Sequence, residues 1–308
     1  MEIGGDATER KHTIGLVAVS YRSEPEIVQL LQSLAGDRPS LSVEVVVVSN
    51  SGDCGALDKQ ENVRVVHPGG NIGYARACNL GASLLKTEYI VFCNPDVRIS
   101  EECVYALADT LAANPEFGMM SPFESQHALS CLPSGKVFDA SKTSRCIGHC
   151  FVIRRDFFEA IGGWDEGFFL YWEDTELRDR VVDRGKKIGF AEGITVLHSG
   201  QHSVVNLQPG QRKFLAQAYL CSHAYYILAR RGKLAVFLWL VRTCVKNGCK
   251  LLLRGRRGPD SQVRVPHRSV FYHLYDVKAL FSLRMLANFY RLTSFVKFDG
   301  RRFPWQQD

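Results

Sequence analysis

The stretch Glu88-Tyr-Ile-Val-Phe-Cys-Asn-Pro-Asp96 decides the predicted fold of this chain. Residues 89–93 are apolar without interruption, which is typical of a strand buried on both faces of a parallel sheet. Pro95 lacks an amide hydrogen, so the strand ends there and Asp96 is presented at its carboxyl end. Ligands of open α/β sheets bind at that edge, where a carboxylate can hold a divalent cation that in turn binds a diphosphate. Taken alone, Asn-Pro-Asp favours an ordinary turn.

Outward from this stretch, apolar runs and polar turns alternate as in an α/β protein. We expect further strands at residues 12–20, 43–48, 63–66, 147–153 and 189–197, and helices that begin at Ser23, Gly73, Ser100, Arg155 and Thr175. Ser23 and Glu26 form a predicted capping box, and Ser100 caps its helix at Cys103. This order predicts a doubly wound mixed sheet with helices on both faces. Residues 123–145 lack periodicity and predict a loop near the site, or disorder.

The composition is that of a globular protein. The chain has 308 residues, of which 46% are hydrophobic and 23% charged, so it can bury a sizeable core. Residues 1–12 are polar and charged, and we expect a tail there rather than a signal peptide. The net charge of +6 is unevenly distributed, because residues 1–200 carry 19 Lys and Arg against 28 Asp and Glu, and residues 201–308 carry 19 against 4. We therefore expect a globular domain over residues 13–205 and a basic helical region over residues 206–308.

The ten cysteines are scattered, and most of them lie in apolar runs, for example Cys93, Cys103 and Cys221. This pattern predicts reduced, buried thiols of a cytosolic protein. Cys146-x-x-x-Cys150, with His149 between them, fits no common zinc pattern and is expected to pack in a strand.

Two further stretches carry candidate chemistry. In Trp164-Asp-Glu-Gly-Phe-Phe-Leu-Tyr-Trp-Glu-Asp174, aromatic residues wall a short loop that ends in two carboxylates, which suits sugar binding and proton abstraction. An ordinary helix cap at Asp174 is the alternative. In the helix that Gly73 opens, free amides can face a phosphate, with Arg76 and Asn79 on one face. An ordinary helix start with a solvated arginine is the alternative. His198 follows the last expected strand, in the same sheet as Asp96.

With these motifs in hand, residues 13–200 resemble glycosyltransferase family 2, in particular enzymes similar to bacterial rhamnosyltransferases. The matching stretches are Val19-Ser-Tyr-Arg-Ser-Glu24, Asn71-x-Gly-Tyr-x-x-Ala-x-Asn-x-Gly81, Asn94-Pro-Asp-Val97, Gly162-Gly-Trp-Asp-Glu-x-Phe-Phe-Leu-Tyr-x-Glu-Asp-x-Glu-Leu-x-x-Arg180 and Val196-Leu-His198. The long glycine-to-arginine motif is highly specific in combination with Asn-Pro-Asp.

The resemblance implies a GT-A fold, an Mg²⁺ or Mn²⁺ ion, inversion at the anomeric carbon, and a donor such as dTDP-rhamnose or a UDP-sugar. The implied acceptor is a glycan or lipid-linked glycan of bacterial surface polysaccharide. Asp96 and His198 resemble the family's metal ligands and Asp174 its catalytic base, with Glu173 as the second candidate. Donor binding is implied for Ser20, Tyr21, Arg22, Asn50, Asn71, Tyr74, Arg76, Asn79 and Asn94, and the acceptor side for Trp164, Asp165, Tyr171 and Trp172. Ser49 stands where many relatives have an aspartate.

In the basic region we expect helices at about residues 211–231, 233–254 and 269–292. Leu234 to Val241 is an apolar run too short for a bilayer crossing, which takes roughly 20 residues. Arg242, Lys246, Lys250 and Arg254 follow at a spacing of four, which predicts a helix at an anionic membrane surface on the cytoplasmic face. Packing on the globular domain is the alternative, and a nucleic-acid partner is not expected.

Two other functions compete with sugar transfer. A nucleotidyltransferase-like enzyme also uses a doubly wound sheet and a metal, but it would need a glycine-rich, lysine-bearing loop where Tyr21-Arg-Ser-Glu24 stands. An inactive nucleotide-sugar-binding protein would have no use for Asp96, Asp174 and His198 together.

Overall fold

The computed structural model describes residues 12–36, 41–52, 57, 62–125, 127–143, 148–198 and 209–254. The chain divides into two compact units. The first comprises Met1–Phe169 and Glu173–Ser203, and the second Leu170–Trp172 and Val204–Asp308. The short stretch before Glu173 thus groups with the C-terminal part of the chain.

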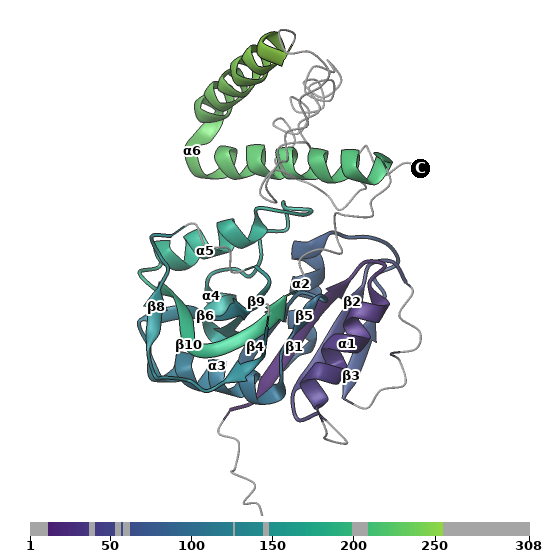
Figure 1. The fold of residues 1–308 in the computed structure, drawn as a ribbon, viewed down its shortest axis with the longest axis vertical. Coiled ribbons are helices and arrows are strands. Elements are labelled where there is room, and N and C mark those ends of the chain that lie inside the picture. Colours follow the sequence, from purple (N-terminus) through teal and green to yellow (C-terminus); the bar gives the residue numbers. More distant parts are fainter. Residues whose placement is uncertain are drawn as a thin grey trace, which may run out of the picture. The chain divides into compact units, whose positions relative to one another are not determined.

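A mixed sheet forms the centre of the first unit (Figure 1). Its strands are β1 (Ile14–Ser20), β2 (Glu44–Ser49), β3 (Val63–Val66), β4 (Tyr89–Cys93), β5 (Val97–Arg98), β6 (Phe117–Ser125), β7 (Ser130–Cys131), β8 (Val137–Asp139), β9 (Cys150–Arg154) and β10 (Lys187–His198). The order is β3-β2-β1-β4-β9-β6-β10-β5, and β7 and β8 pair with β10. Strands β3, β2, β1 and β4 are mutually parallel, as are β6 and β10, whereas β9 runs antiparallel to β4 and β6. The predicted mixed α/β sheet is confirmed.

Helices cover both faces of this sheet. They are α1 (Glu24–Ala35), α2 (Tyr74–Leu84), α3 (Glu101–Ala113), α4 (Arg155–Ala160) and α5 (Glu173–Asp183). Leu16 of β1 shares one buried core with residues of α1 and α3, whereas the next residue, Val17, faces α2. A Cβ at Gly81 of α2 would lie 2.5 Å from Val17 Cγ1, so this helix packs very closely on the sheet. Successive residues of a strand face opposite sides, which explains why β1 is buried along its whole length.

Several boundaries differ from the sequence prediction. Strand β6 was not predicted, because the apolar residues Phe117 to Met120 are followed by Ser121-Pro122, which interrupts the pattern. The predicted loop 123–145 instead contains the end of β6 and the short strands β7 and β8, which are held by pairing with β10. That pairing is non-local and leaves no periodic signal in the sequence.

The two predicted helix caps have different outcomes. The cap of α3 is confirmed, since Cys103 N donates to Ser100 Oγ at 3.4 Å. The capping box of α1 is wrong, because the Ser23 hydroxyl makes no cap bond. It lies 3.1 Å from Ser20 Oγ and accepts from Tyr21 N at 3.3 Å.

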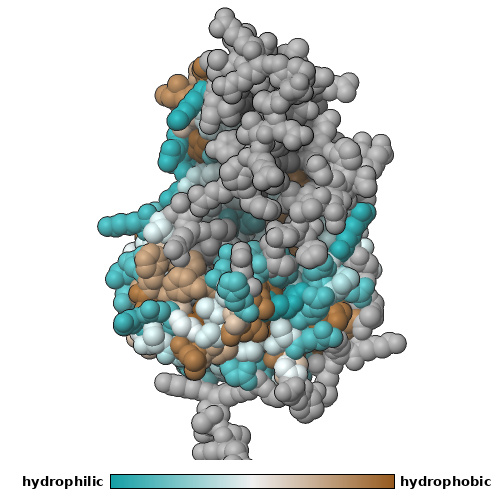
Figure 2. All heavy atoms as spheres, in the orientation of Figure 1, coloured by the Kyte–Doolittle hydropathy of each residue, from teal (hydrophilic) through white to brown (hydrophobic). Residues whose placement is uncertain are grey.

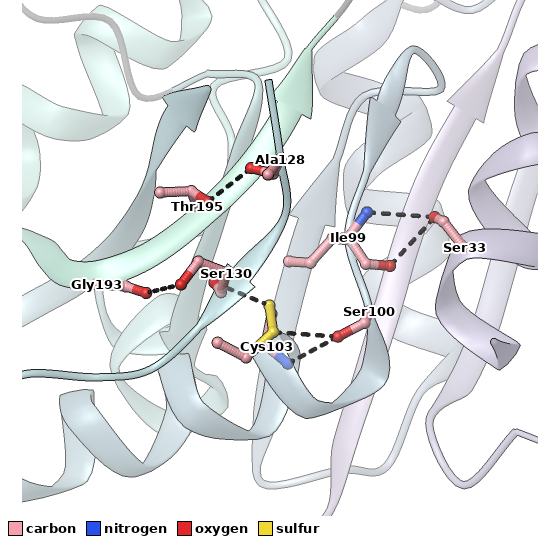
Figure 3. The surroundings of a disulfide bond; sticks show 9 residues. Ser33, Ile99, Ser100, Cys103, Ala128, Ser130, Gly193 and Thr195 are labelled. Atoms are coloured by element: carbon pink, nitrogen blue, oxygen red, sulfur yellow. Dashed lines mark hydrogen bonds between the residues drawn. A yellow bond between two sulfur atoms is a disulfide. The ribbon is translucent and has the colours of Figure 1, made fainter. Parts of the chain in front are cut away.

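Cys103 of α3 and Cys131 of β7 form a disulfide bond (Figure 3). The prediction of reduced thiols is therefore wrong for this pair. Pairing of β7 with β10 brings Cys131 to α3, and the neighbouring Ser130 hydroxyl donates to the Gly193 carbonyl at 2.9 Å. Cys78, Cys93 and Cys150 are free and buried, as predicted, and Cys221 is free and half-buried.

The second unit contains α6 (Pro209–Arg254), which is broken at Gly232. This glycine has φ 79°, a value that glycine adopts readily, and it separates two helical segments visible in Figure 1. The predicted helices 211–231 and 233–254 are confirmed, and the third, at 269–292, lies outside the described residues. Among the described helices, none has the length and apolarity to span a bilayer.

Candidate active site

The strand directions bring four polar side chains to one edge of the sheet. Asp96 lies between β4 and β5, and His149 directly precedes β9, which runs antiparallel to β4. Asn94 N donates to the His149 carbonyl at 2.8 Å, which fixes these two turns side by side. Glu124 and His198 lie at the carboxyl ends of the parallel strands β6 and β10. Residues far apart in the sequence therefore meet at this edge.

His198 lies at the centre of this cluster. Its Nε2 is 3.3 Å from Asp96 Oδ2, and its Nδ1 bonds to the carboxylate of Glu124. His149 Nδ1 is 3.6 Å from Glu124 Oε1, and the two imidazoles stack with centroids 5.1 Å apart. One potential ligand atom from each of Glu124, His149 and His198 lies within 4.8 Å of the others.

Without a metal ion, the surroundings shift the pKa values of the two histidines in opposite directions. Burial by itself would lower the pKa of His198, but hydrogen bonds to Asp96 and Glu124 outweigh it and raise the pKa to about 9. Burial lowers the pKa of His149 to about 4, against the opposing effect of Glu124. His149 is therefore neutral near pH 7, and its Nε2 is buried without a hydrogen-bond partner among the described residues.

These residues fit a divalent cation. Two carboxylates and the neutral imidazole of His149, with its unpaired nitrogen, offer oxygen and nitrogen ligands, and His198 would join them on giving up its proton, because a metal ligand must be deprotonated. The sequence prediction named Asp96 and His198, which the structure brings together, but missed Glu124 and His149. Glu124 lies in the stretch predicted to be a loop, and His149 lies between two cysteines in a segment predicted only to pack in a strand. Cys150 does pack as predicted, in the core of β9, and Cys146 lies outside the described residues.

Asp174 lies in the first turn of α5, which starts two residues earlier than predicted. Its Oδ1 accepts from Thr175 N at 2.7 Å. A Cβ added at Gly148 would lie 2.8 Å from Asp174 Oδ2, so this carboxylate rests against the backbone that leads into His149. The base predicted from the motif is thus next to the candidate metal ligands.

Glu173 is buried, and burial followed by the negative charge of Asp174 raises its pKa to about 8. At neutral pH most Glu173 side chains carry a proton. A protonated carboxyl cannot accept another proton, which favours Asp174 over Glu173 as a base.

The predicted donor residues at the ends of β1 and β2 are joined by hydrogen bonds. Asn50 N donates to the Ser20 carbonyl at 2.8 Å, and Arg22 N donates to Ser51 Oγ at 2.8 Å. The Asn50 side chain donates to the Gly73 carbonyl at 3.3 Å, which ties this edge to the start of α2. Tyr21 is 51% exposed. These groups form a polar rim beside the cluster.

The predicted donor residues of α2 have partners that brace neighbouring loops. Tyr74 Oη donates to Asn94 Oδ1 at 3.1 Å, which holds the Asn-Pro-Asp turn. Asn79 donates to the Trp164 carbonyl at 2.9 Å, and Arg76 Nε lies 3.6 Å from Glu166 Oε2. Upstream of this helix, Asn71 Oδ1 accepts from Gly73 N at 3.0 Å. Donor contacts by these side chains stay a prediction.

The predicted acceptor residues separate into two groups. Trp164 is 1% exposed and packs edge-on against Phe92, so its ring belongs to the core. Asp165 Oδ1 accepts from Gly167 N at 2.9 Å within the adjoining turn. Tyr171 and Trp172 belong to the second unit, where Trp172 stacks on His223 of α6 with centroids 3.9 Å apart. An acceptor contact by either residue stays a prediction.

Comparison with known proteins finds similarity to enzymes that transfer sugars. Residues 16–162 match the family model described as Glycosyl transferase family 2. An N-acetylglucosaminyl-diphospho-decaprenol L-rhamnosyltransferase of Mycobacterium tuberculosis is 26% identical over 237 residues, which cover 61% of this chain and 76% of the relative. The rhamnosyltransferase WbbL of Escherichia coli is 21% identical over 240 residues, which cover 66% of this chain and 87% of WbbL.

A solved structure with a similar fold is the mannosyltransferase PcManGT from Pyrobaculum calidifontis, in complex with GDP-Man and Mn²⁺. It superposes with a TM-score of 0.56 at 16% sequence identity, over 87% of this chain and 86% of that one. The likeness shows a shared fold, of the GT-A type.

Proposed function

We propose that this chain, whose residues 16–162 match the model of Glycosyl transferase family 2, transfers a sugar, with inversion, from a nucleotide-diphosphate donor to a glycan or lipid-linked glycan. The observation that carries the proposal is the close approach of Asp174 to Gly148, which puts a carboxylate against the backbone next to His149, a member of the cluster with Asp96, Glu124 and His198. The Mycobacterium and Escherichia relatives are named as rhamnosyltransferases, so a rhamnose donor such as dTDP-rhamnose is the first to test and UDP-sugars are the second.

In this proposal Asp96, Glu124, His149 and His198 would hold a divalent cation. The two imidazoles favour Mn²⁺ over Mg²⁺, since Mg²⁺ prefers oxygen ligands. When bound, such an ion offsets the negative charge that develops on a leaving diphosphate. The polar rim of Ser20, Arg22 and Asn50, together with Tyr21, Asn71, Tyr74, Arg76, Asn79 and Asn94, would contact the donor.

Asp174 acts as the general base. Its carboxylate takes the proton of the acceptor hydroxyl while that oxygen forms a bond to the anomeric carbon. The bond from the anomeric carbon to the diphosphate oxygen breaks, and its electron pair leaves with the diphosphate. Attack from the side opposite the leaving group inverts the configuration. Glu173, protonated near neutral pH, would donate a hydrogen bond rather than accept the proton.

The experiment compares Asp174→Asn with the unmodified protein on a panel of nucleotide sugars and a soluble acceptor analogue. Asn keeps the size and can still accept from Thr175 N, so stability should change little. Transfer should fall by about 10²–10⁴-fold, the usual contribution of general base catalysis, with donor affinity retained. Asp109→Asn is the matched control, because the side chain of Asp109 is 61% exposed on α3 and should leave transfer unchanged.

The released product separates this proposal from its competitors. Sugar transfer or slow donor hydrolysis releases a nucleoside diphosphate, whereas nucleotidyl transfer breaks the bond between the two phosphates. An inactive binding protein would release neither product. Full transfer by Asp174→Asn would return Asp174 to the role of a helix cap.

We further propose that the reaction takes place at the cytoplasmic face of a membrane. The name of the Mycobacterium relative, which includes a diphospho-decaprenol, supports an acceptor with a lipid part. A lipid-linked acceptor would require the enzyme to work close to a bilayer.

A further inference from the structure

The second segment of α6 exposes a row of large apolar side chains. They are Leu234, Phe237, Leu238, Val241 and Val245, with 71%, 60%, 57%, 44% and 60% of their surface exposed. Residues three and four apart lie on the same face of a helix, so these five form one continuous stripe. Hydrophobic surface is visible on this part of α6 in the space-filling view (Figure 2). Contiguous apolar surface of this kind marks a contact site.

The opposite face of this segment is already occupied within the second unit. Val236 is only 3% exposed, and the ring of Trp239 meets His223 of the first segment edge-on, with centroids 4.9 Å apart. The helix therefore has a packed face and an apolar face that the described residues do not cover. Packing among the described residues of this unit therefore does not explain the exposed row.

Cations flank the apolar row. At about 100° per residue, Lys233 and Arg242 lie roughly a quarter-turn to either side of the row's centre, and both are exposed. Long basic side chains in this position can keep their charge in water while their stems cover apolar surface. Arg231, also exposed, adds a third cation next to the break at Gly232. This arrangement suits a partner that is apolar beneath an anionic surface.

We propose that this apolar row, Leu234 to Val245, docks on an anionic lipid bilayer with the helix lying in the plane of the interface. Charge complementarity selects the bilayer among the possible occupants. A second copy would bring together two regions that each carry 19 Lys and Arg against 4 Asp and Glu. Residues 255–308 of the same chain carry 10 against 4, so they too would add like charge. Anionic lipid offers opposite charge and hydrocarbon together.

The bilayer would be the partner of the membrane-side reaction proposed above, and this docking rests on that proposal. The test of docking does not require sugar transfer. The full chain is floated with vesicles of neutral lipid and with vesicles that also contain an anionic phospholipid. The double variant Phe237→Gln and Leu238→Gln removes two members of the row. The matched control is Leu132→Gln with Phe138→Gln, which alters the same residue types, 80% and 44% exposed, in the first unit.

The row variant should bind anionic vesicles about a hundredfold more weakly, since each large apolar side chain moved out of water is worth roughly tenfold or more. The control pair should bind like the unmodified chain. Lys233→Gln with Arg242→Gln should weaken binding about tenfold or more at low salt, and this difference should vanish at high salt.

Three outcomes would overturn the proposal. The unmodified chain could fail to bind anionic vesicles, or the row variant could bind them as well as the control does. The row variant could also convert a dimer to a monomer in the absence of lipid, which would identify a second copy as the occupant. Donor hydrolysis measured without vesicles keeps the two proposals separate, because the row variant should retain it.

Discussion

Gly148 lies directly against the side chain of Asp174. A Cβ at position 148 would be 2.8 Å from Asp174 Oδ2 and 3.0 Å from its Cβ, closer than unstrained contacts allow. Gly148 is followed by His149, one of the four candidate metal ligands. The absence of a side chain at 148 therefore permits the proposed base and the proposed metal ligands to share one site.

Gly148→Ala should push the Asp174 carboxylate out of place. We expect transfer to fall at least tenfold, because a base displaced by a fraction of an ångström loses alignment with the acceptor hydroxyl. Donor affinity should be nearly unchanged. Gly70→Ala is the control, since a Cβ there meets nothing within 4 Å. Equal turnover by the two variants would show that the contact has no role in catalysis.

Glu173→Gln should change how stability depends on pH. The pKa of Glu173 is raised from its ordinary 4.5 to about 8 in the folded state, chiefly by burial. The folded protein therefore holds a proton that the unfolded chain releases, so the free energy of unfolding falls as pH rises from about 4.5 to 8. Gln removes this dependence and should make the protein several kcal/mol more stable at pH 9, as an order of magnitude.

Chemical denaturation at pH 5 and pH 9 measures this effect. The two proteins should be similar at pH 5, and the variant should be more stable at pH 9. Glu44→Gln, at an exposed position of β2, is the control and should follow the unmodified protein. Parallel curves for Glu173→Gln and the unmodified protein would mean that Glu173 titrates normally.

Cys131→Ser should destabilise the first unit by removing the bond to Cys103. The two cysteines are 28 residues apart in the chain, and closing a loop of that length is worth about 3–4 kcal/mol in the chain-entropy model. Denaturation under non-reducing conditions should show this difference. Adding a reductant should bring the unmodified protein to the level of the variant, and identical stabilities without reductant would exclude the disulfide.

His223→Ala should lower turnover through the segment that precedes the proposed base. Tyr171 and Trp172 both have φ of 71°, a strained conformation for residues with large side chains. Within the second unit, Trp172 is stacked on His223 and the Leu170 carbonyl accepts from Ser222 Oγ at 2.8 Å. Glu173 and Asp174 follow directly in the chain, so loss of the stack should relax the residues that lead to them.

Steady-state kinetics test this role. His223→Ala should lower kcat about tenfold with little change in the KM for the donor, and His223→Phe, which keeps a ring in the stack, should retain most activity. Burial, followed by the charge of Arg231, lowers the pKa of His223 to about 4. The imidazole is therefore neutral near pH 7, and replacing it with Phe removes no positive charge. Loss of activity in both variants, or in neither, would contradict a stacking role.

The sequence alone predicted the parts of this fold that have a local signal. Tyr89 to Cys93 is apolar without interruption, and Pro95 ends it, so β4 and the position of Asp96 followed from the residues themselves. Strand β6 was missed, since its second half is polar and it is a strand because β9 and β10 lie on either side of it. The disulfide was missed because it also depends on a non-local pairing, that of β7 with β10.

In the candidate site, the sequence predicted the residues that belong to recognisable motifs and missed the others. Asp96 and His198 stand in recognisable patterns, and the register of β5 with β10 brings them together. Glu124 and His149 join them only because β9 reverses direction between β4 and β6, a topological fact with no signature in the residues nearby. Trp164, which the motif assigned to the acceptor side, has its ring in the core, and its burial has no local signal in the sequence.

We expect this cluster to hold a divalent cation that the donor needs. The most direct measurement is calorimetric titration of the full chain with a nucleoside diphosphate, with and without Mn²⁺, for the unmodified protein, Asp96→Asn and His149→Gln. His67→Gln, at an exposed position, is the control. We predict Mn²⁺-dependent binding in the unmodified protein and the control, and a loss of at least tenfold in the two cluster variants. Binding that is independent of Mn²⁺, or equally dependent on it in all four proteins, would show that the cluster holds no cation for the donor.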